Sequence, residues 1–134
     1  MLKVGSIVGD DSASAPKWYD YRGARLLIAP VGTKAYDAAL ARLSRKDRRL
    51  RQRSAAGLEV EDEMLHITMK VTAHAVLKGW EGIMEDDGST PIPYSPEKAL
   101  EFFEKSYKFY RAVASFALGA AAQEAEEQEE DSKN

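Results

Sequence analysis

The chain has 134 residues, a length that predicts one domain able to bury a core of its own. It contains no cysteine, which excludes disulfides and thiolate metal sites, and no apolar run reaches the roughly 18 residues of a membrane helix. The formal net charge of -3 conceals two local fields of opposite sign, a basic one at 42–53 and an acidic one at 124–131.

The beginning of the chain predicts a flexible arm followed by a β-hairpin. Residues 1–16 are rich in Gly, Ser, Ala and Asp and end at a proline, which is typical of a mobile terminal arm. The segments 17–22 and 25–31 are short, aromatic or branched, and separated by Gly23, so we expect two strands joined by a turn. The hairpin opens a mostly helical domain expected to span 17–122.

A first helix is predicted over 33–53, with Thr33 as its cap and a break at 54–57. Its apolar residues form one narrow stripe, which favours a peripheral position. The stripe consists of Tyr36, Leu40, Leu43 and Leu50.

A second helix is predicted over 58–78, led by four acidic residues that interact favourably with the helix dipole. Two adjacent apolar stripes give it a wide apolar face, which is typical of a central core helix. The β-branched residues between Ile67 and Val71 leave a strand as the alternative.

The rest of the chain predicts a hairpin, two helices and a tail. Residues 79–95 contain an Asp-Asp-Gly turn and two prolines, which favours a small hairpin or ordered loop. Ser95 followed by Pro96 begins a helix over 96–105, and Ser106 can cap another over 107–123. The acidic, polar segment 123–134 is predicted to be a disordered tail. The expected fold class is α+β, mainly α, with three to four helices and one or two short hairpins.

The sequence offers little support for catalysis or metal binding. His66 and His74 lie eight residues apart, so on one helix they are about 12 Å apart along the axis and cannot share a metal ion. The segment 86–89 lacks the ligand spacing of a calcium loop and favours a turn. Because no nucleophile, phosphate-binding or dinucleotide motif is present, we expect no catalytic residue, no metal and no cofactor, and a protein that is not an enzyme.

The arginine-rich segment is the sharpest charged feature of the sequence. It allows three interpretations: a solvated helix face, a phosphate-binding face of a nucleic-acid accessory protein, or a docking strip for an acidic protein segment such as the chain's own tail. No aromatic residue lies between the arginines, which weakens the case for single-stranded nucleic acid. The strip consists of Arg42, Arg45, Arg48, Arg49, Arg51 and Arg53.

The aromatic residues of the C-terminal half are candidates for partner binding. They lie on two adjacent helix faces, so that one face can pack in the core while part of the other grips an apolar helix of a partner. Trp80 and Tyr94 are favoured as core or loop anchors. The candidate set is Trp80, Tyr94, Phe102, Phe103, Tyr110 and Phe116.

The order of motifs in this half resembles that of the tail assembly chaperones of long-tailed, lambda-like bacteriophages. The sequence contains GWEGI at 79–83, a DDG turn, PIPYSPEKAL at 91–100, FYRAVASFA at 109–117 and an acidic end. The family carries a similar tryptophan-glycine loop, a PxPYSPE-like helix start and a polar C-terminal end. The resemblance is best over 65–120 and extends to 1–64 in general organisation only. The arginine strip and the KWYDY segment are not part of it.

The resemblance implies a binding protein that acts in assembly. Such chaperones coat the long, apolar, helical tape measure protein before tail-tube subunits polymerise around it. They tend to self-associate, work in the host cytoplasm and are absent from the mature virion. A minority product with a C-terminal extension, made by frameshifting, is common among them. The expected partners are therefore the tape measure protein, the tail-tube protein and further copies of the chain, with no membrane and no nucleic acid.

Overall fold

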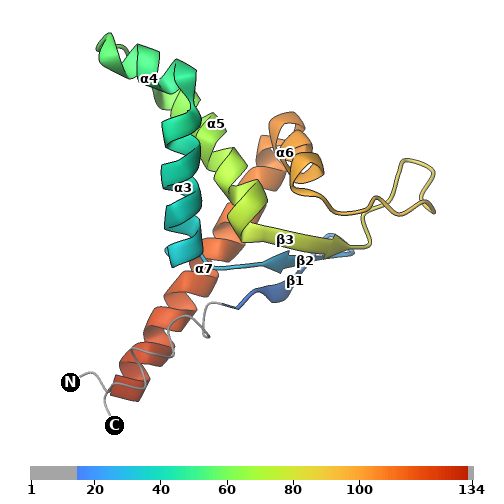
Figure 1. Cartoon of the computed structure of the whole chain (residues 1–134). Coiled ribbons are helices and arrows are strands. Elements are labelled where there is room, and N and C mark those ends of the chain that lie inside the picture. The colour runs from blue at the N-terminus through green and yellow to red at the C-terminus, as the bar shows by residue number, and fades with distance from the viewer. Residues whose placement is uncertain (1–14, 133–134) are drawn as a thin grey trace.

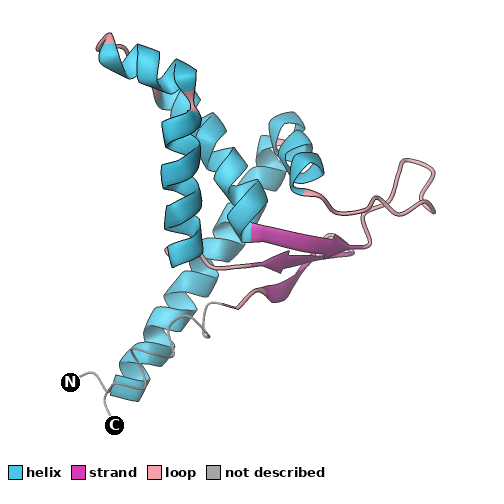
Figure 2. Ribbon diagram, viewed as in Figure 1, coloured by secondary structure: helices cyan, strands magenta, loops and turns pink. Residues whose placement is uncertain are grey.

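A three-stranded sheet and a set of helices form the part of the chain that the computed structural model describes, residues 15–132. Five α-helices and one antiparallel sheet lie in this range, so the chain is α+β and mainly α-helical (Figure 1). The long C-terminal helix passes beside the sheet, the helix at 96–105 stands above the last strand, and the helices at 34–71 lie toward the end of the sheet where that strand begins (Figure 2). Most of the predicted flexible arm, 1–16, falls outside the described residues.

The predicted hairpin at 17–31 is confirmed. Strand β1 (Lys17–Tyr21) pairs antiparallel with β2 (Ala24–Ile28), with Trp18 opposite Leu27. The connection has only two residues, Arg22 at φ 48° and Gly23 at φ 86°. Positive φ at both positions produces a turn whose twist matches that of the strands, and the glycine adopts this conformation without strain.

The predicted helix at 58–78 is wrong at its C-terminal end. Helix α5 (Glu61–Val71) continues as a short π-helix (Thr72–Val76) and then becomes strand β3 (Leu77–Glu81). Strand β3 pairs antiparallel with β2, which places Trp80 opposite Leu26. Because this pairing joins segments about fifty residues apart, the helical periodicity of the sequence could not reveal it.

The predicted inventory of three to four helices with one or two short hairpins is therefore corrected. The residues expected to form a second hairpin contribute β3 to the same sheet as the first, in the order β1-β2-β3. Beyond β3 only an isolated bridge joins Met84 to Pro91. Five helices appear in the described range partly because the predicted helix at 33–53 is two helices.

Asp47 divides that segment into α3 (Lys34–Lys46) and α4 (Arg48–Ala55). The backbone of Asp47 is extended, and its carboxylate accepts a hydrogen bond from the Leu50 amide at 2.7 Å. An aspartate at this position satisfies an otherwise unpaired amide of the next helix and so stabilises a new start. Thr33 caps α3 as predicted, accepting from the Tyr36 amide at 3.0 Å.

The two C-terminal helices begin where the sequence predicts. Ser95 caps α6 (Pro96–Lys105) through the Lys98 amide, and Ser106 accepts from the Phe109 amide at the start of α7 (Tyr107–Ser132). The backbone of α7 remains helical through Ser132, across the segment that composition predicts to be a disordered tail.

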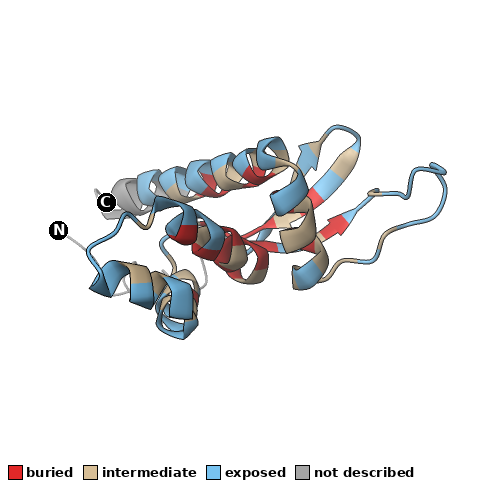
Figure 3. Cartoon of the chain, turned by 90° about the horizontal axis from the view of Figure 1, so that it is seen from above, coloured by how far each residue is buried: buried red, intermediate tan, exposed pale blue. Residues whose placement is uncertain are grey.

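Two apolar clusters form the core. The larger joins the sheet to α5, α6 and α7 and includes the fully buried Leu26, Phe103 and Val113. The smaller joins α3 to α5 through Ala39 and Ile67. Buried residues gather where the helices meet the sheet, while α4 and the outer part of α7 are exposed (Figure 3).

Candidate protein-binding site

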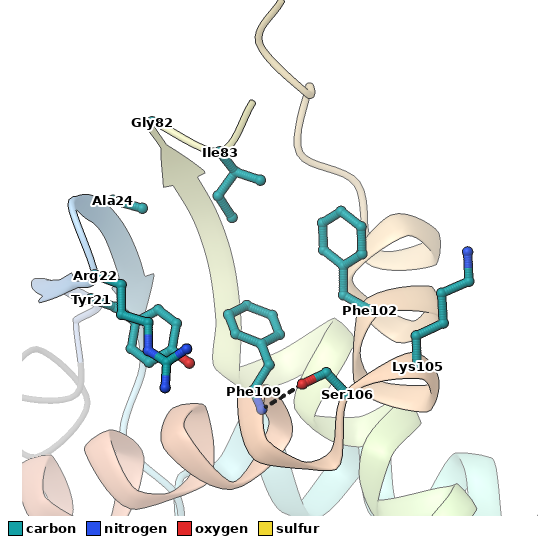
Figure 4. Close-up of a pocket in the computed structure, with 9 residues that line it drawn as sticks. All are labelled: Tyr21, Arg22, Ala24, Gly82, Ile83, Phe102, Lys105, Ser106 and Phe109. Carbon is teal, nitrogen blue, oxygen red and sulfur yellow. Dashed lines mark hydrogen bonds between the residues drawn. The ribbon is translucent and has the colours of Figure 1, made fainter. Parts of the chain in front are cut away.

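An open apolar hollow of about 350 Å³ lies between the β1–β2 turn, the end of β3 and the junction of α6 with α7. The side chains of Ile83, Phe102 and Phe109 point into it from three different segments (Figure 4). Tyr21 forms another wall, with its ring centroid 5.7 Å from that of Phe109. The hollow therefore offers aromatic and aliphatic carbon to a ligand while its mouth remains open to solvent.

The loop between β3 and α6 is held in place by the residues of the tryptophan and proline-tyrosine motifs. The Trp80 indole donates a hydrogen bond from Nε1 to the Ile92 carbonyl at 2.7 Å. The Tyr94 hydroxyl donates to the carbonyls of Ala73 and Leu77, where the π-helix meets β3. These bonds satisfy polar groups close to the core and fix the loop that carries Ile83.

The aromatic rings of this region form one connected stack. Trp80 lies 5.4 Å from Phe102 in a stacked arrangement and 5.0 Å from Tyr94 edge to face. Phe102 in turn meets Phe109 at 6.3 Å. Packing of this kind contributes beyond the area it buries, so these ring contacts stabilise the wall of the hollow.

Two cationic side chains line the hollow. The Arg22 guanidinium lies 5.4 Å from the centroid of the Tyr21 ring, and Lys105 Nζ lies 2.8 Å from Glu101 Oε1. The hydrogen bond from Lys105, with a further one from Lys98, lowers the pKa of Glu101, and the same bond to Glu101 raises the pKa of Lys105. Lys105 is therefore charged at neutral pH, and the hollow combines apolar walls with positive charge.

The six predicted partner-binding residues are divided between the core and the hollow. Phe103 is fully buried, while Trp80 and Tyr110 are each 8% exposed, so these three belong to the core. Tyr94 is half-buried under the loop, and Phe116 stacks on Tyr19 at 5.0 Å, where α7 packs on β1. Only Phe102 of the six lines the hollow.

The predicted arginine strip divides into a structural pair and an exposed group. Arg49 and Arg53 both contact the carboxylate of Glu63, at 3.2 Å and 2.9 Å. The Glu63 side chain is only 7% exposed, so this pair attaches α4 to α5. The remaining four, Arg42, Arg45, Arg48 and Arg51, are exposed and have no ion pair with the described side chains.

Within the described range the structure contains no cluster of side chains that could hold a metal ion. His66 contacts Glu104 at 3.5 Å on the protein surface, and the chain places His74 elsewhere, on the π-helix. None of the helices described has both the length and the apolarity needed to cross a membrane.

The family described as YdaY prophage protein matches residues 31–134, most of the chain. The chain belongs to the YdaY prophage protein family. It is therefore phage-derived. Searches of curated proteins and of solved structures returned no match. The matched range carries Ile83, Phe102 and Phe109 of the hollow, whereas the hairpin wall with Tyr21 and Arg22 lies before it.

Sequence reasoning missed most residues of the hollow in this YdaY family member. Tyr21 and Phe109 appeared only as a strand residue and a helix-face residue, and Ile83 as part of a loop motif. Their meeting depends on the pairing of β2 with β3, which carries the loop over the junction of α6 with α7. One available signal was the Arg22-Gly23 turn, since a short hairpin of aromatic residues needs an apolar surface to pack against.

Proposed function

We propose that this prophage protein is a tail assembly chaperone that binds the tape measure protein through the hollow beside Phe102. The observation that carries the proposal is the open hollow itself, with Tyr21, Ile83, Phe102 and Phe109 as its walls. A concave, largely apolar site with few polar groups is the common form of a binding site. The resemblance of the motif order to that of tail assembly chaperones, on a phage-derived chain, supports the choice of client.

The shape of the hollow suits an apolar helix. A client helix that repeats apolar residues at every third or fourth position could insert one or two large side chains between the rings. Arg22 and Lys105 would then meet acidic residues that flank the apolar stripe of the client. Such a site shelters an elongated apolar protein segment by segment, which is what a tape measure requires before the tail tube surrounds it.

The remaining parts of the proposal follow from this role. The protein works in the host cytoplasm without catalysis or a cofactor, helps to recruit tail-tube subunits to the coated tape measure, and leaves before the virion is complete. Nucleic acid and membranes are not among its partners.

Coexpression with the tape measure protein of the same prophage tests the proposal, with Ile83→Glu as the blocking variant. Because a carboxylate in the apolar hollow would have to be desolvated, we expect the recovered tape measure protein to fall about tenfold. Leu118→Glu is the matched control, since Leu118 is 60% exposed on α7 and does not line the hollow. This control should retain the client.

Equal recovery with both variants would show that the client binds elsewhere. Normal tails from a phage that lacks the gene would remove the proposed function altogether. Circular dichroism of each variant before the pull-down separates a blocked site from an unfolded protein.

A further inference from the structure

The tip of the α3–α4 arm is an exposed basic surface. Seven basic residues and one aspartate occupy 42–53, and two of the arginines are engaged by Glu63. The others form what we call the basic pole: Arg42, Arg45, Lys46, Arg48 and Arg51, all exposed. Figure 1 shows this tip projecting from the body of the molecule at the end of the arm.

The opposite charge lies at the end of α7. Residues 124–131 contain six acidic residues and no basic one, and the backbone of this segment continues the helix as far as Ser132. We call this segment the acidic pole. Each copy of the chain thus carries one helical acidic segment with six anionic residues and one exposed surface with five cationic residues.

The two poles of one molecule are at opposite ends. Figure 1 shows α4 at the top of the molecule and the end of α7 at the bottom, with the core between them. Salt screens exposed charges beyond about 8 Å at physiological ionic strength, so the poles of one copy cannot neutralise each other.

We propose that the basic pole of one copy binds the acidic pole of a second copy, head to tail. The contact joins different surfaces of the two molecules, so each dimer keeps one free pole of each sign and can add further copies. A ring or an open row of chaperones results. The inference goes beyond the client site, since no residue that lines the hollow belongs to either pole.

Charge complementarity favours this occupant over nucleic acid. The acidic segment is present at the same concentration as the basic one, whereas the whole chain has a net charge of -3 and would be repelled by polyphosphate. Single exposed ion pairs contribute little, but an array of five cations facing six anions contributes through their sum and sets the orientation of the partners.

Reciprocal charge reversal tests the proposal. The arm variant carries Arg42→Glu, Arg45→Glu, Arg48→Glu and Arg51→Glu, which makes the tip acidic. The tail variant carries Glu126→Lys, Glu127→Lys, Glu129→Lys and Glu130→Lys, which makes the end of α7 basic. All the new residues are good helix formers, and the four replaced arginines are exposed and do not belong to the core.

The mass in solution is measured by light scattering at low and high salt. We expect the unmodified protein to exceed the monomer mass of 14.9 kDa at low salt. At 0.5 M salt the Debye length falls to about 4 Å, so the mass should approach that of the monomer. Each variant alone has two poles of like sign, so its self-association should be roughly tenfold weaker or less. An equimolar mixture pairs every pole with its opposite, and the heavier species should return.

Three results would overturn the proposal. The first is an unmodified protein that stays at 14.9 kDa at low salt over the whole concentration range. The second is a mixture of the two variants that remains monomeric. The third is an arm variant that keeps the self-association of the unmodified protein but loses binding to a short DNA duplex, since the arm would then be a nucleic-acid site. Ile83→Glu should leave the mass unchanged, which keeps this test independent of the client site.

Discussion

At the scale of single residues, the motif side chains act by holding backbone in place. Trp80 and Tyr94 are the most prominent aromatic residues of the loop region, yet their polar atoms bind carbonyl groups of the chain itself. Burial raises the pKa of the Tyr94 hydroxyl, with a smaller contribution from Glu97, so it remains a donor at neutral pH. These residues position Phe102 and Ile83 for a client and have little surface of their own to offer.

The turn at the tip of the same loop depends on one carboxylate. Asp87 accepts hydrogen bonds from the amides of Ser89 and Thr90, each at 2.9 Å, and from the Thr90 hydroxyl at 2.6 Å. The bond from the Thr90 hydroxyl is the largest cause of a pKa lowered from 3.8 to about 2. Hydrogen bonds to the charged form favour it, and protonation must break them.

The pH dependence of this turn follows from that sign. Because the folded pKa is depressed, the stabilising bonds are fully present above pH 3.8 and are lost as the pH falls through about 2. NMR titration of the Asp87 carboxyl carbon and the Thr90 amide should give a common midpoint near 2. A midpoint near 4 would contradict the turn geometry, and Asp87→Asn should abolish the transition at the Thr90 amide.

At the scale of helices and strands, residues close together in the sequence predicted where helices begin. Pairing between distant segments determined the third strand of the sheet. Thr33, Ser95 and Ser106 could be recognised as caps because each acts within three residues of its own position. Strand β3 could not be recognised, since its residues continue a helical pattern and are drawn into the sheet by β2. The break at Asp47 was missed because the apolar stripe continues across it to Leu50.

The candidate site follows the same division. Phe102 could be predicted from the aromatic faces of the C-terminal half, and Trp80 was favoured as an anchor, which its burial confirms. The choice of Phe103 and Tyr110 could not be refined, because periodicity gives no information on which helix face is covered. The hollow forms where the β1–β2 turn, the end of β3 and the α6–α7 junction come together, and the pairing of β2 with β3 brings them together.

Helix α4 is attached by few contacts, and its attachment to α5 depends on Glu63. None of its described residues is buried, and Glu63 binds both Arg49 and Arg53. Glu63→Gln keeps the shape but removes the charge, so we expect the free energy of unfolding to fall by about 1 kcal/mol and the α4 amides to exchange faster. Urea denaturation and hydrogen exchange measure the two effects. Glu61→Gln, two residues earlier on the same helix and exposed, is the control, and equal exchange in both variants would contradict the role of Glu63.

At the scale of the whole molecule, one framework supports two separate surfaces. The larger cluster joins the sheet to α6 and α7, and the smaller joins α3 to α5. Helix α5 belongs to both, through Met69 in the larger and Ile67 in the smaller. The elements that carry the hollow and the two charged poles therefore share one core. A substitution at the centre of that core should destabilise all of these elements together.

Phe103 is the residue at which this expectation can be measured. It is fully buried and lies 5.5 Å from both Phe109 and Tyr110, between α6 and α7. Phe103→Leu leaves a small cavity and should lower the free energy of unfolding by about 1–2 kcal/mol. Tyr107→Leu, on the same helix pair but 53% exposed, should change it by less than about 0.5 kcal/mol. Unfolding followed by tryptophan fluorescence and by circular dichroism should give one coincident transition in every variant, because both clusters share α5. Separate transitions for the two signals would mean that the arm and the sheet fold independently, and the shared core would then be wrong.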